Sequence, residues 1–497
     1  MAEMVKQTGH KVVAAPSRAD RPTSFNLADI PLPTGREEDW RFTPLDRIKM
    51  LLTDTLEGAA PRVEVSGELL GADNRINLGA SSYVEIATGS DIHGKVGAPG
   101  DRAAVVEWNN HRDLVNVVIA EQLSEPLRIK VIGENPEPAA QHICIDVKPD
   151  AKALVILEHT GNAQLNQGIE IDVESGAQLE FVSIQEWDRA AVHASNHRMS
   201  VEKDAKLKHI AITLGGDLVR ICPDIDLDKP GGDVEMYGVY FTDTRQHQEH
   251  RLFVNHSAEN CRSDVHYKGA LQGQQAHAVW IGDVLIGKNG FNTDSYEQNR
   301  NLVLNEGAKA DSVPNLEIEN GEIAGAGHAS ATGRFDEEQL FYLLSRGIPE
   351  DIARKMVVHG FFAEVIRQIG IEEIENHLLE AVDARLEKVC EISALEPAEA
   401  LRAEVTDERG DKIPIAVVRD EDGGWHAIDS LCTHGDIPLE EGDVEGCAIE
   451  CWGHGAQFDL NTGQPTMPAT EPVNCYQLEI KGQAVYVDAC SRSKGNE

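Results

Sequence analysis

The stretch Ala177-Gln178-Leu179-Glu180-Phe181-Val182-Ser183-Ile184 carries apolar side chains that recur at about every second position. Residues 153–157 and 207–212 are runs of the same kind. A period of two is typical of a β-strand, because successive side chains of a strand point to opposite faces. These runs therefore predict strands, and they dominate the sequence between about residues 87 and 320.

This stretch is one copy of a weak internal repeat, in which a small residue precedes each strand. Successive copies begin 26, 28, 27 and 26 residues apart, at Ala151, Ala177, Ala205, Gly232 and Ala258, and a further copy begins at Ala308. A period of this length, rich in strands and without helices between them, predicts a β-solenoid whose coils stack on one another. A β-sandwich with regular turns is the alternative.

Changes of pattern along the chain divide it into five segments. Residues 1–24 are polar and are expected to be disordered, and residues 25–86 are expected to form an N-terminal helical region. The β core takes residues 87–335, and a second helical region takes residues 336–392. Residues 393–497 predict a small β domain, so that the fold class is mainly β.

Two short loops of the last segment carry two cysteines and two histidines. Cys432, His434, Cys451 and His454 follow the pattern C-x-H-x16-C-x-x-H, so that each loop holds one residue of each type. A Rieske-type [2Fe–2S] centre, with two Cys on one iron and two His on the other, requires this donor set. Tetrahedral Zn²⁺ is the rival, but zinc fingers pair Cys with Cys and His with His in sequence. We therefore predict that these four residues bind a [2Fe–2S] cluster.

The surroundings of this motif resemble the soluble Rieske-type ferredoxins, which serve as electron carriers. Ile437 and Gly453 stand where high-potential Rieske proteins have a disulfide, and Ala456 and Phe458 stand where those proteins have a Ser and a Tyr hydroxyl. Hydrogen bonds to sulfur stabilise the reduced cluster, so that their absence lowers the reduction potential. The resemblance implies a potential near or below about −100 mV.

Composition argues against several classes of partner. The formal net charge of −39 disfavours nonspecific nucleic-acid binding, which needs a basic surface. No run of about 20 apolar residues exists, and residues 1–6 lack the apolar part of a secretory signal. The nine cysteines are odd in number and widely spread, which fits a reducing compartment. We therefore expect a cytoplasmic protein that binds neither nucleic acid nor a membrane.

The charge of the last segment points to a redox partner of the opposite charge. Residues 391–497 hold 22 acidic and 7 basic side chains, a net charge of −15. An acidic electron carrier docks well on a basic reductase or acceptor, although a solvated surface is the plainer interpretation. The sequence does not identify this partner.

Through residue 390 the sequence resembles SufD, a component of the SufBCD complex for iron–sulfur cluster assembly. The first matching motif is Glu37-Glu38-Asp39-Trp40-Arg41-Phe42-Thr43-Pro44-Leu45, and the others lie at residues 301–308, 314–318, 333–343, 345–348 and 360–362. The motifs are ordered along about three quarters of the chain. Together with the last segment, the sequence resembles a SufD fused to a Rieske-type ferredoxin.

The SufD resemblance implies a right-handed parallel β-helix flanked by helical segments, with SufB-like and SufC-like proteins as partners. It implies a scaffold subunit and electron carrier and not an enzyme, because ATP hydrolysis belongs to SufC. Arg346, Gly347, Phe361 and Phe362 would contact the SufC-like partner. Packing in the core is the alternative for the two phenylalanines.

A Cys-x-His near the end of the SufD β-helix places a histidine at the SufB interface, where a nascent cluster is thought to form. Here the segment is Ala326-Gly327-His328, with Ala in place of Cys. The resemblance implies that His328 is an interfacial iron ligand for this transient cluster, and that the thiolate comes from the SufB-like partner. A purely structural histidine is the alternative.

Asp243, His247 and His250 have the residue types of a two-histidine, one-carboxylate iron site. They lie in an expected strand, however, where residues three apart point to opposite faces unless a bulge intervenes. We therefore expect no iron site here.

The function predicted from these patterns is a scaffold subunit for iron–sulfur cluster assembly whose Rieske module supplies single electrons. Persulfide sulfur must be reduced to sulfide during assembly, and a tether raises the effective concentration of the electron carrier to roughly millimolar. The alternative is the ferredoxin component of an oxygenase or another redox system. A terminal Rieske oxygenase is disfavoured, because it needs a mononuclear iron site after the Rieske domain and only about forty residues follow His454.

Overall fold

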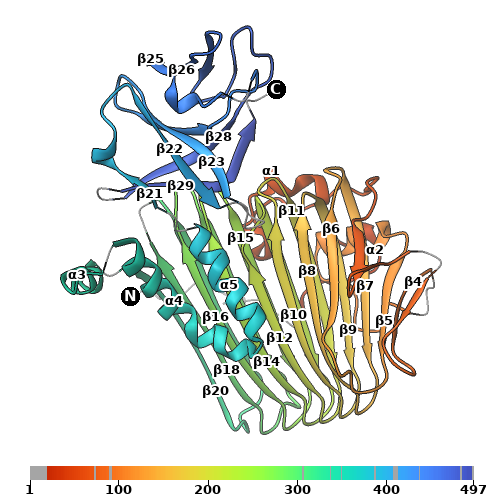
Figure 1. Ribbon diagram of the computed structural model, residues 1–497. Coiled ribbons are helices and arrows are strands. Elements are labelled where there is room, and N and C mark those ends of the chain that lie inside the picture. Colours follow the sequence, from red (N-terminus) through yellow and green to blue (C-terminus); the bar gives the residue numbers. More distant parts are fainter. Residues whose placement is uncertain are drawn as a thin grey trace, which may run out of the picture.

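The computed structural model describes residues 20–71, 74–88, 92–304, 307–335, 337–348, 350–385, 388–406, 412–435, 437–481 and 484–494. Most of the segment 1–24, for which we expect disorder, therefore lies outside the described residues. A long β-solenoid forms the body of the described chain, and a small β domain lies at one end of the solenoid strands (Figure 1). No described helix has both the length and the apolar composition needed to cross a membrane.

Two sheets of ten strands make up the solenoid, and successive strands alternate between them. The first sheet has the order β2 (Glu68–Leu69), β1 (Arg62–Val65), β6 (Leu127–Gly133), β8 (Lys152–Gly161), β10 (Gln178–Trp187), β12 (Lys206–Thr213), β14 (Asp233–Thr242), β16 (Arg262–Leu271), β18 (Asp294–Val303), β20 (Gly325–Arg334). The second has the order β3 (Arg75–Asn77), β4 (Tyr83–Ala87), β5 (Leu114–Ile119), β7 (Pro138–Val147), β9 (Gln164–Val173), β11 (Val192–Val201), β13 (Leu218–Leu227), β15 (His247–His256), β17 (His277–Ile286), β19 (Lys309–Ile318). From β5 and β6 onward the pairing is parallel, which confirms the predicted solenoid over the sandwich.

Equivalent positions of the sequence repeat lie side by side on neighbouring strands of the first sheet. Leu179 of β10 lies between Ala153 of β8 and Leu207 of β12. Stacking of equivalent positions lets each coil bury its apolar face on the next. The copy expected at Ala308 precedes β19 instead, which belongs to the second sheet. Each coil contains two strands, and a small residue can precede either of them.

The expected helical region 25–86 is helical only in its first half. Its helices are short: η2 (Leu27–Asp29), η3 (Glu38–Trp40), α1 (Leu45–Ile48) and η4 (Lys49–Leu51). From Arg62 onward it forms β1 to β4, so that the expectation of helices is wrong there. The physical reason is a period of two: Val63 and Val65 alternate with polar residues and both pack in the solenoid core. A longer helix, α2 (Arg102–Asn110), lies instead inside the expected β core and packs across β7 and β9.

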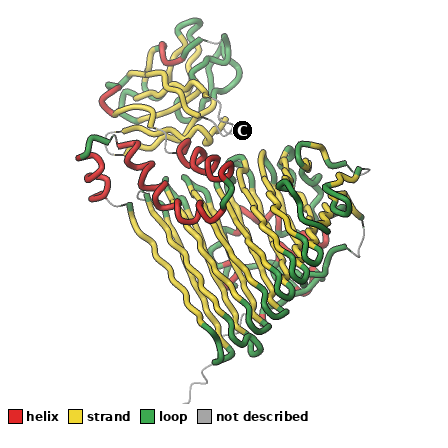
Figure 2. The backbone as a smooth tube through the Cα atoms, turned by 60° about the horizontal axis from the view of Figure 1, so that its bottom comes forward, coloured by secondary structure: helices red, strands yellow, loops and turns green. Residues whose placement is uncertain are grey.

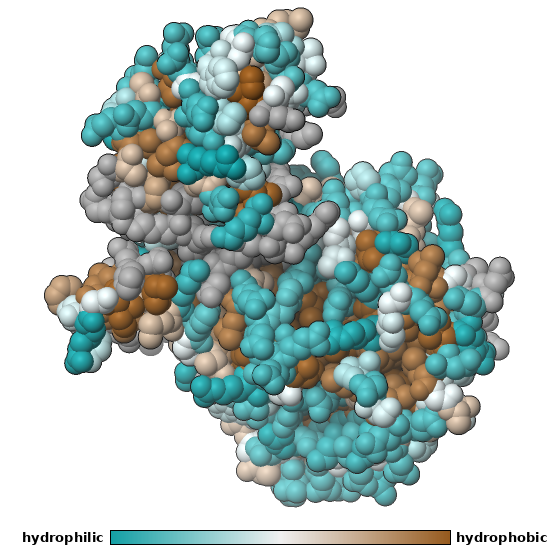
Figure 3. All heavy atoms as spheres, viewed as in Figure 1, coloured by the Kyte–Doolittle hydropathy of each residue, from teal (hydrophilic) through white to brown (hydrophobic). Residues whose placement is uncertain are grey.

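Three helices follow the solenoid: α3 (Glu337–Ser345), α4 (Glu350–Ile369) and α5 (Glu372–Arg385). Helices α4 and α5 lie across the outer face of the first sheet (Figures 1 and 2). There Phe362 and Leu378 pack in one cluster with Ile184 and Ile212 of the sheet. Helix α3 stands to the side of this layer, and apolar side chains are exposed on it (Figure 3).

The small domain consists of two antiparallel sheets. The larger has the order β21 (Lys388–Glu391), β29 (Ala484–Lys494), β28 (Asn474–Lys481), β24 (Trp425–Asp429), β23 (Lys412–Arg419), β22 (Glu399–Thr406). The smaller consists of β25 (Asp443–Glu445), β26 (Ala448–Cys451) and β27 (Ala456–Asp459). The domain begins earlier than the expected residue 393, because β21 pairs with β29 nearly a hundred residues further along the chain. Only this long-range pairing marks the boundary.

Candidate metal centre and partner surfaces

The four expected cluster ligands lie at the tips of two loops of the small domain. The first loop leads from β24 to η6 (Leu439–Glu441), and the Cys432 amide donates to the Ile437 carbonyl at 2.8 Å. The second loop joins β26 to β27, and the Gly455 amide donates to the Cys451 carbonyl at 2.9 Å. Gly455 has a φ of +70°, a conformation that glycine adopts at little cost. Both tips are thus tight turns that aim their ligands at the same place.

Within this site the two cysteines lie together and the two histidines lie together. The thiols of Cys432 and Cys451 are buried at 1% and 0% exposure, whereas His434 and His454 are exposed, with ring centroids 4.4 Å apart. Burial raises the pKa of the Cys432 thiol, and the adjacent Cys451 thiol acts in the same direction. Each loop therefore contributes its thiol to an inner pair and its imidazole to an outer pair.

This geometry suits a two-iron core better than a single ion. Zinc would draw all four donor atoms to about 2.0–2.3 Å from one point. Several groups of the described residues bring three donor atoms within 4.8 Å of one another, but none of these groups contains the four expected cluster ligands. A [2Fe–2S] centre with the thiolates on the inner iron and the imidazoles on the outer iron fits the donors as they stand.

The loops are supported by packing and by one side-chain hydrogen bond. A Cβ on Gly453 would lie 2.1 Å from Ile437 Cδ1, so that the Ile437 side chain occupies the space above this glycine. Thr433 Oγ1 donates to the Glu471 carbonyl at 2.6 Å, which ties the first loop to the chain before β28. Beneath the site, Ala456 and Phe458 are fully buried and neither carries a hydroxyl group. An apolar contact stands where high-potential Rieske proteins have a disulfide.

His328 lies on β20, the last strand of the first sheet. Its side chain is 44% exposed, and its Nδ1 is 3.8 Å from Glu297 Oε1 on the neighbouring β18. Burial, followed by the charge of Asp283, raises the pKa of Glu297 to about 8. His328 is therefore accessible at the open end of the solenoid, beside a carboxyl group that is largely protonated at neutral pH.

The four residues expected to contact a SufC-like partner differ in accessibility. Arg346 and Gly347 are exposed in the turn after α3. Phe362 is fully buried against the first sheet, whereas Phe361 is half-buried and its carbonyl accepts a hydrogen bond from Lys268 Nζ at 2.7 Å. Beside them, Phe341 and Tyr342 of α3 are 72% and 55% exposed.

Asp243, His247 and His250 do not form an iron site. His250 points into the solenoid, where its ring stacks on Tyr240 at 5.0 Å. His247 contacts Glu249 at 3.1 Å and the His277 ring instead. The two histidines make separate sets of contacts, as expected for residues three apart on a strand.

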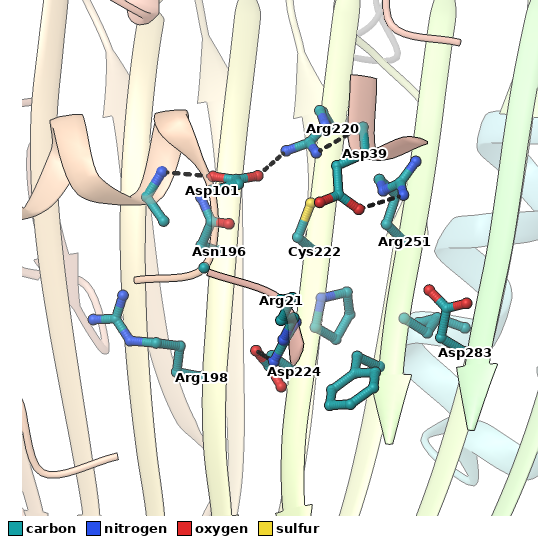
Figure 4. A pocket seen from close by; sticks show the side chains of 15 residues that line it. Arg21, Asp39, Asp101, Asn196, Arg198, Arg220, Cys222, Asp224, Arg251 and Asp283 are labelled. Atoms are coloured by element: carbon teal, nitrogen blue, oxygen red, sulfur yellow. Dashed lines mark hydrogen bonds and ion pairs between the residues drawn. The ribbon is translucent and has the colours of Figure 1, made fainter. Parts of the chain in front are cut away.

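A charged pocket that the sequence did not indicate lies between the N-terminal segment and the second sheet (Figure 4). Arg220 Nη1 donates to Asp101 Oδ2 at 2.6 Å, and Arg251 Nη2 donates to Asp39 Oδ1 at 2.9 Å. Arg21 pairs with Asp224 in the same pocket, and Arg198 and Asp283 also line it. Because its acids and bases balance, we interpret the pocket as a clamp that holds the N-terminal segment on the solenoid and not as an anion site.

Comparison with known proteins agrees with this architecture. The family model of the SUF system FeS cluster assembly SufBD core domain matches residues 131–361, and that of the Rieske [2Fe–2S] domain matches residues 386–477. An iron–sulfur cluster assembly SufBD family protein of Mycobacterium tuberculosis is 42% identical over 373 residues, which cover 73% of this chain and 92% of the relative. The SufD protein of Escherichia coli is 24% identical over 381 residues, covering 71% and 89%.

Solved structures similar to the chain cover the small domain. The ferredoxin of carbazole 1,9a-dioxygenase from Nocardioides aromaticivorans is 32% identical, with 20% of this chain and 94% of that chain covered and a TM-score of 0.19. A Sphingomonas yanoikuyae ferredoxin is 29% identical, with 20% and 96% covered and a TM-score of 0.19. From the family models and the mycobacterial relative we conclude that the chain belongs to the SufBD family of iron–sulfur cluster assembly proteins and also carries a Rieske [2Fe–2S] domain.

Proposed function

We propose that this protein is a SufD-like scaffold subunit that acts with SufB-like and SufC-like proteins in the cytoplasm, and that its Rieske domain supplies electrons to the assembly reaction. In this role the chain itself is not an enzyme, and ATP hydrolysis resides in the SufC-like partner. Three accessible surfaces, at the end of the solenoid, on α3 and at the tip of the Rieske domain, support the proposal.

The end of the solenoid is suited to pairing with a second solenoid. Strands β19 and β20 end the two sheets, and within the described residues no further strand covers their outer edges. An uncovered parallel edge presents backbone donors and acceptors that another chain can use. Along β20 the side chains are mostly small, from Gly325 to Gly333, which allows close approach. His328 would there be an iron ligand, with the thiolate that Ala326 lacks supplied by the SufB-like partner.

The second surface is α3 and the turn that follows it. Phe341 and Tyr342 expose large rings beside Arg346 and Gly347. Exposed aromatic side chains of this size next to an arginine are typical of contact surfaces between proteins. We assign this surface to the SufC-like partner, with Phe361 at its margin and Phe362 as buried support.

The third surface is the tip of the Rieske domain. When bound, a Rieske-type cluster accepts and releases one electron at a time. The protein keeps the two thiols in the interior and presents His434 and His454 at the surface, next to Trp452, which is 60% exposed. Electrons would pass at this exposed side, and the acidic domain would attract a basic redox partner.

The observation that carries the proposal is the presence of the SufBD fold and the Rieske ligand set in one chain. The test is co-expression of the tagged protein with the SufB-like and SufC-like proteins of the same organism. We expect a ternary complex whose dithionite-reduced form gives the EPR signal of a Rieske cluster. Capture of an oxygenase component, with no SufB-like or SufC-like protein retained, would replace the proposal by the ferredoxin alternative.

Single substitutions separate the three surfaces. Phe341→Glu should release the SufC-like partner alone, whereas Phe291→Glu, at another exposed phenylalanine elsewhere on the solenoid, should not. His328→Ala should stop cluster assembly while the complex stays intact.

Cys451→Ser, which removes a ligand of the Rieske cluster, should slow assembly when electrons are limiting. An unchanged assembly rate in that variant would remove the electron-supply role and leave the scaffold role standing.

A further inference from the structure

A cluster of metal-binding side chains lies under α2, far along the chain from the Rieske motif. Glu107 lies in α2, and His111 is the C-cap residue of this helix one turn later, so that both side chains lie on the same side of it. This face meets His142 of β7: Glu107 Oε1 is 2.8 Å from His142 Nδ1 and 3.2 Å from His111 Nδ1. The rings of His111 and His142 are 4.7 Å apart, and one donor atom from each of the three residues lies within 4.8 Å of the others.

Two carboxylates flank His142, and they differ in what they already bind. Glu170 Oε1 is 3.4 Å from His142 Nε2, and both Glu170 oxygens accept hydrogen bonds from the Gly94 amide. Glu170 also accepts from the Lys95 amide and from Arg198 Nη2. It is therefore saturated and neutralised, and its contact with the His142 ring is a charge contact and not a hydrogen bond.

Glu107, by contrast, keeps binding capacity in the interior. Glu107 is fully buried, and its Oε2 has no hydrogen-bond partner among the described residues. Burial of an ionised oxygen without a partner costs free energy that a bound cation would recover. Gly168 of β9 forms the floor of this space, since a Cβ there would lie 2.2 Å from Glu107 Oε2 and 2.7 Å from His142 Nδ1.

We propose that Glu107, His111 and His142 bind one divalent transition-metal ion, Zn²⁺ or Fe²⁺, and that this ion fastens α2 to the second sheet. Two imidazoles and one carboxylate are a donor set that both ions accept. Glu170 would then orient His142 from the opposite ring nitrogen, an arrangement common around metal-bound histidines. The site is enclosed, because the His111 and Glu107 side chains are 8% and 0% exposed, which fits a structural ion.

The alternative is a buried network of ion pairs with no metal, and the two differ in a direct measurement. The full-length, cluster-loaded protein is stripped of loose metal with a chelator and titrated with Zn²⁺ by calorimetry, so that the Rieske ligands are already occupied. We expect one tight site in the parent protein and at least a hundredfold weaker binding in His111→Ala. His377→Ala, at a half-exposed histidine that pairs with Glu186, is the control and should bind as the parent does.

Thermal unfolding gives a second readout that does not depend on how well the variant folds. Zn²⁺ should raise the unfolding temperature of the parent protein, and a chelator should reverse this rise. Fe²⁺, titrated under anaerobic conditions, decides which of the two ions binds more tightly. No tight Zn²⁺ or Fe²⁺ site in the parent protein, or equal affinity in His111→Ala, would overturn the proposal and leave the ion-pair network.

Discussion

The same side chain, histidine, has opposite surroundings in the solenoid and in the Rieske domain. Inside the solenoid, seven histidines are fully buried, and several of them make short polar contacts, among them His159 to Gln167 at 3.0 Å and His197 to His209 at 2.9 Å. In the Rieske domain, His434 and His454 are exposed with their rings side by side. His159, His197 and His209 pack in the core, whereas His434 and His454 are accessible to a metal cluster. Residue type alone does not distinguish these roles; position in the fold does.

Burial has a measurable consequence for the solenoid histidines. It lowers the pKa of His159 to about 4 and those of His209 and His250 to about 3. It also lowers those of His193 and His197 well below the ordinary value. These five imidazoles of the solenoid interior are therefore neutral near pH 7, and their contribution to stability depends on their remaining neutral.

The largest expected effect comes from removing one proposed ligand of the Rieske cluster. Cys451→Ser replaces a buried thiolate by a hydroxyl group that binds iron poorly, so that we expect complete loss of the visible absorption and of the EPR signal of the reduced cluster. The far-ultraviolet circular dichroism of the solenoid should not change. Cys447→Ser is the matched control, because Cys447 is a half-buried thiol of the same domain outside the ligand set. A normal EPR signal in Cys451→Ser would contradict the ligand assignment.

The second prediction concerns acid. The folded pKa values of the buried histidines lie below the unfolded value of about 6.5, so that the unfolded chain binds protons first as the pH falls. Their stabilisation is complete above pH 6.5 and is lost as the pH falls toward about 3, at roughly 3 kcal/mol for His159. The raised pKa values of Asp172, about 6, of Glu297, about 8, and of His142 act in the opposite direction but are outnumbered.

A pH titration followed at two places tests this contrast between the domains. Far-ultraviolet circular dichroism reports on the solenoid, which contains two sheets of ten strands, and visible circular dichroism reports on the Rieske cluster. We expect the solenoid signal to change between pH 6.5 and 4. His159→Gln should shift the transition to lower pH. A solenoid signal that is constant down to pH 4 would contradict the prediction.

The third prediction concerns the clamp between the N-terminal segment and the solenoid. Arg220 is 1% exposed, pairs with Asp101 and stacks on the Trp40 ring at 4.1 Å. Arg220→Met leaves Asp101 and the buried Glu249 with fewer counter-charges, and should cost about 3–5 kcal/mol in the free energy of unfolding. The control Arg75→Met removes an exposed pair with Glu85 and should cost at most about 1 kcal/mol. Denaturant titration of both variants would show whether burial makes this difference, and equal costs would refute it.

The smallest expected effect is a shift of the reduction potential. Ala456→Ser places a hydroxyl group opposite Cys451, its partner across the β26–β27 pair. A hydrogen bond of about 1 kcal/mol to the cluster or its thiolate should raise the potential by roughly 40 mV for a one-electron couple. Ala448→Ser, at the other end of β26, is the control for adding a hydroxyl group to the same strand. A potential that is unchanged or lower in Ala456→Ser would show that the hydroxyl group does not reach the sulfur.

Much of the molecule is predictable because its signals are local. The ligand motif spans two loops of a few residues, and the solenoid shows itself through a period repeated from coil to coil. The helical expectation for residues 62–86 is wrong because their strands complete sheets whose other strands lie far along the chain. Likewise, β21 belongs to the Rieske domain only through its pairing with β29. A local pattern indicates that a strand can form, and pairing with strands that are distant in sequence determines whether it does.

The sequence by itself determined the stacking of coils, the Rieske motif and the order of the domains, because these depend on neighbours within a few residues or on a repeated period. Only the tertiary structure decided which histidines are buried and which are exposed. It also decided that Arg220 meets Asp101, and that Glu107 meets His142 across 35 positions of the chain. The physical reason is that burial and charge pairing depend on which residues are neighbours in space, and the whole fold determines those neighbours.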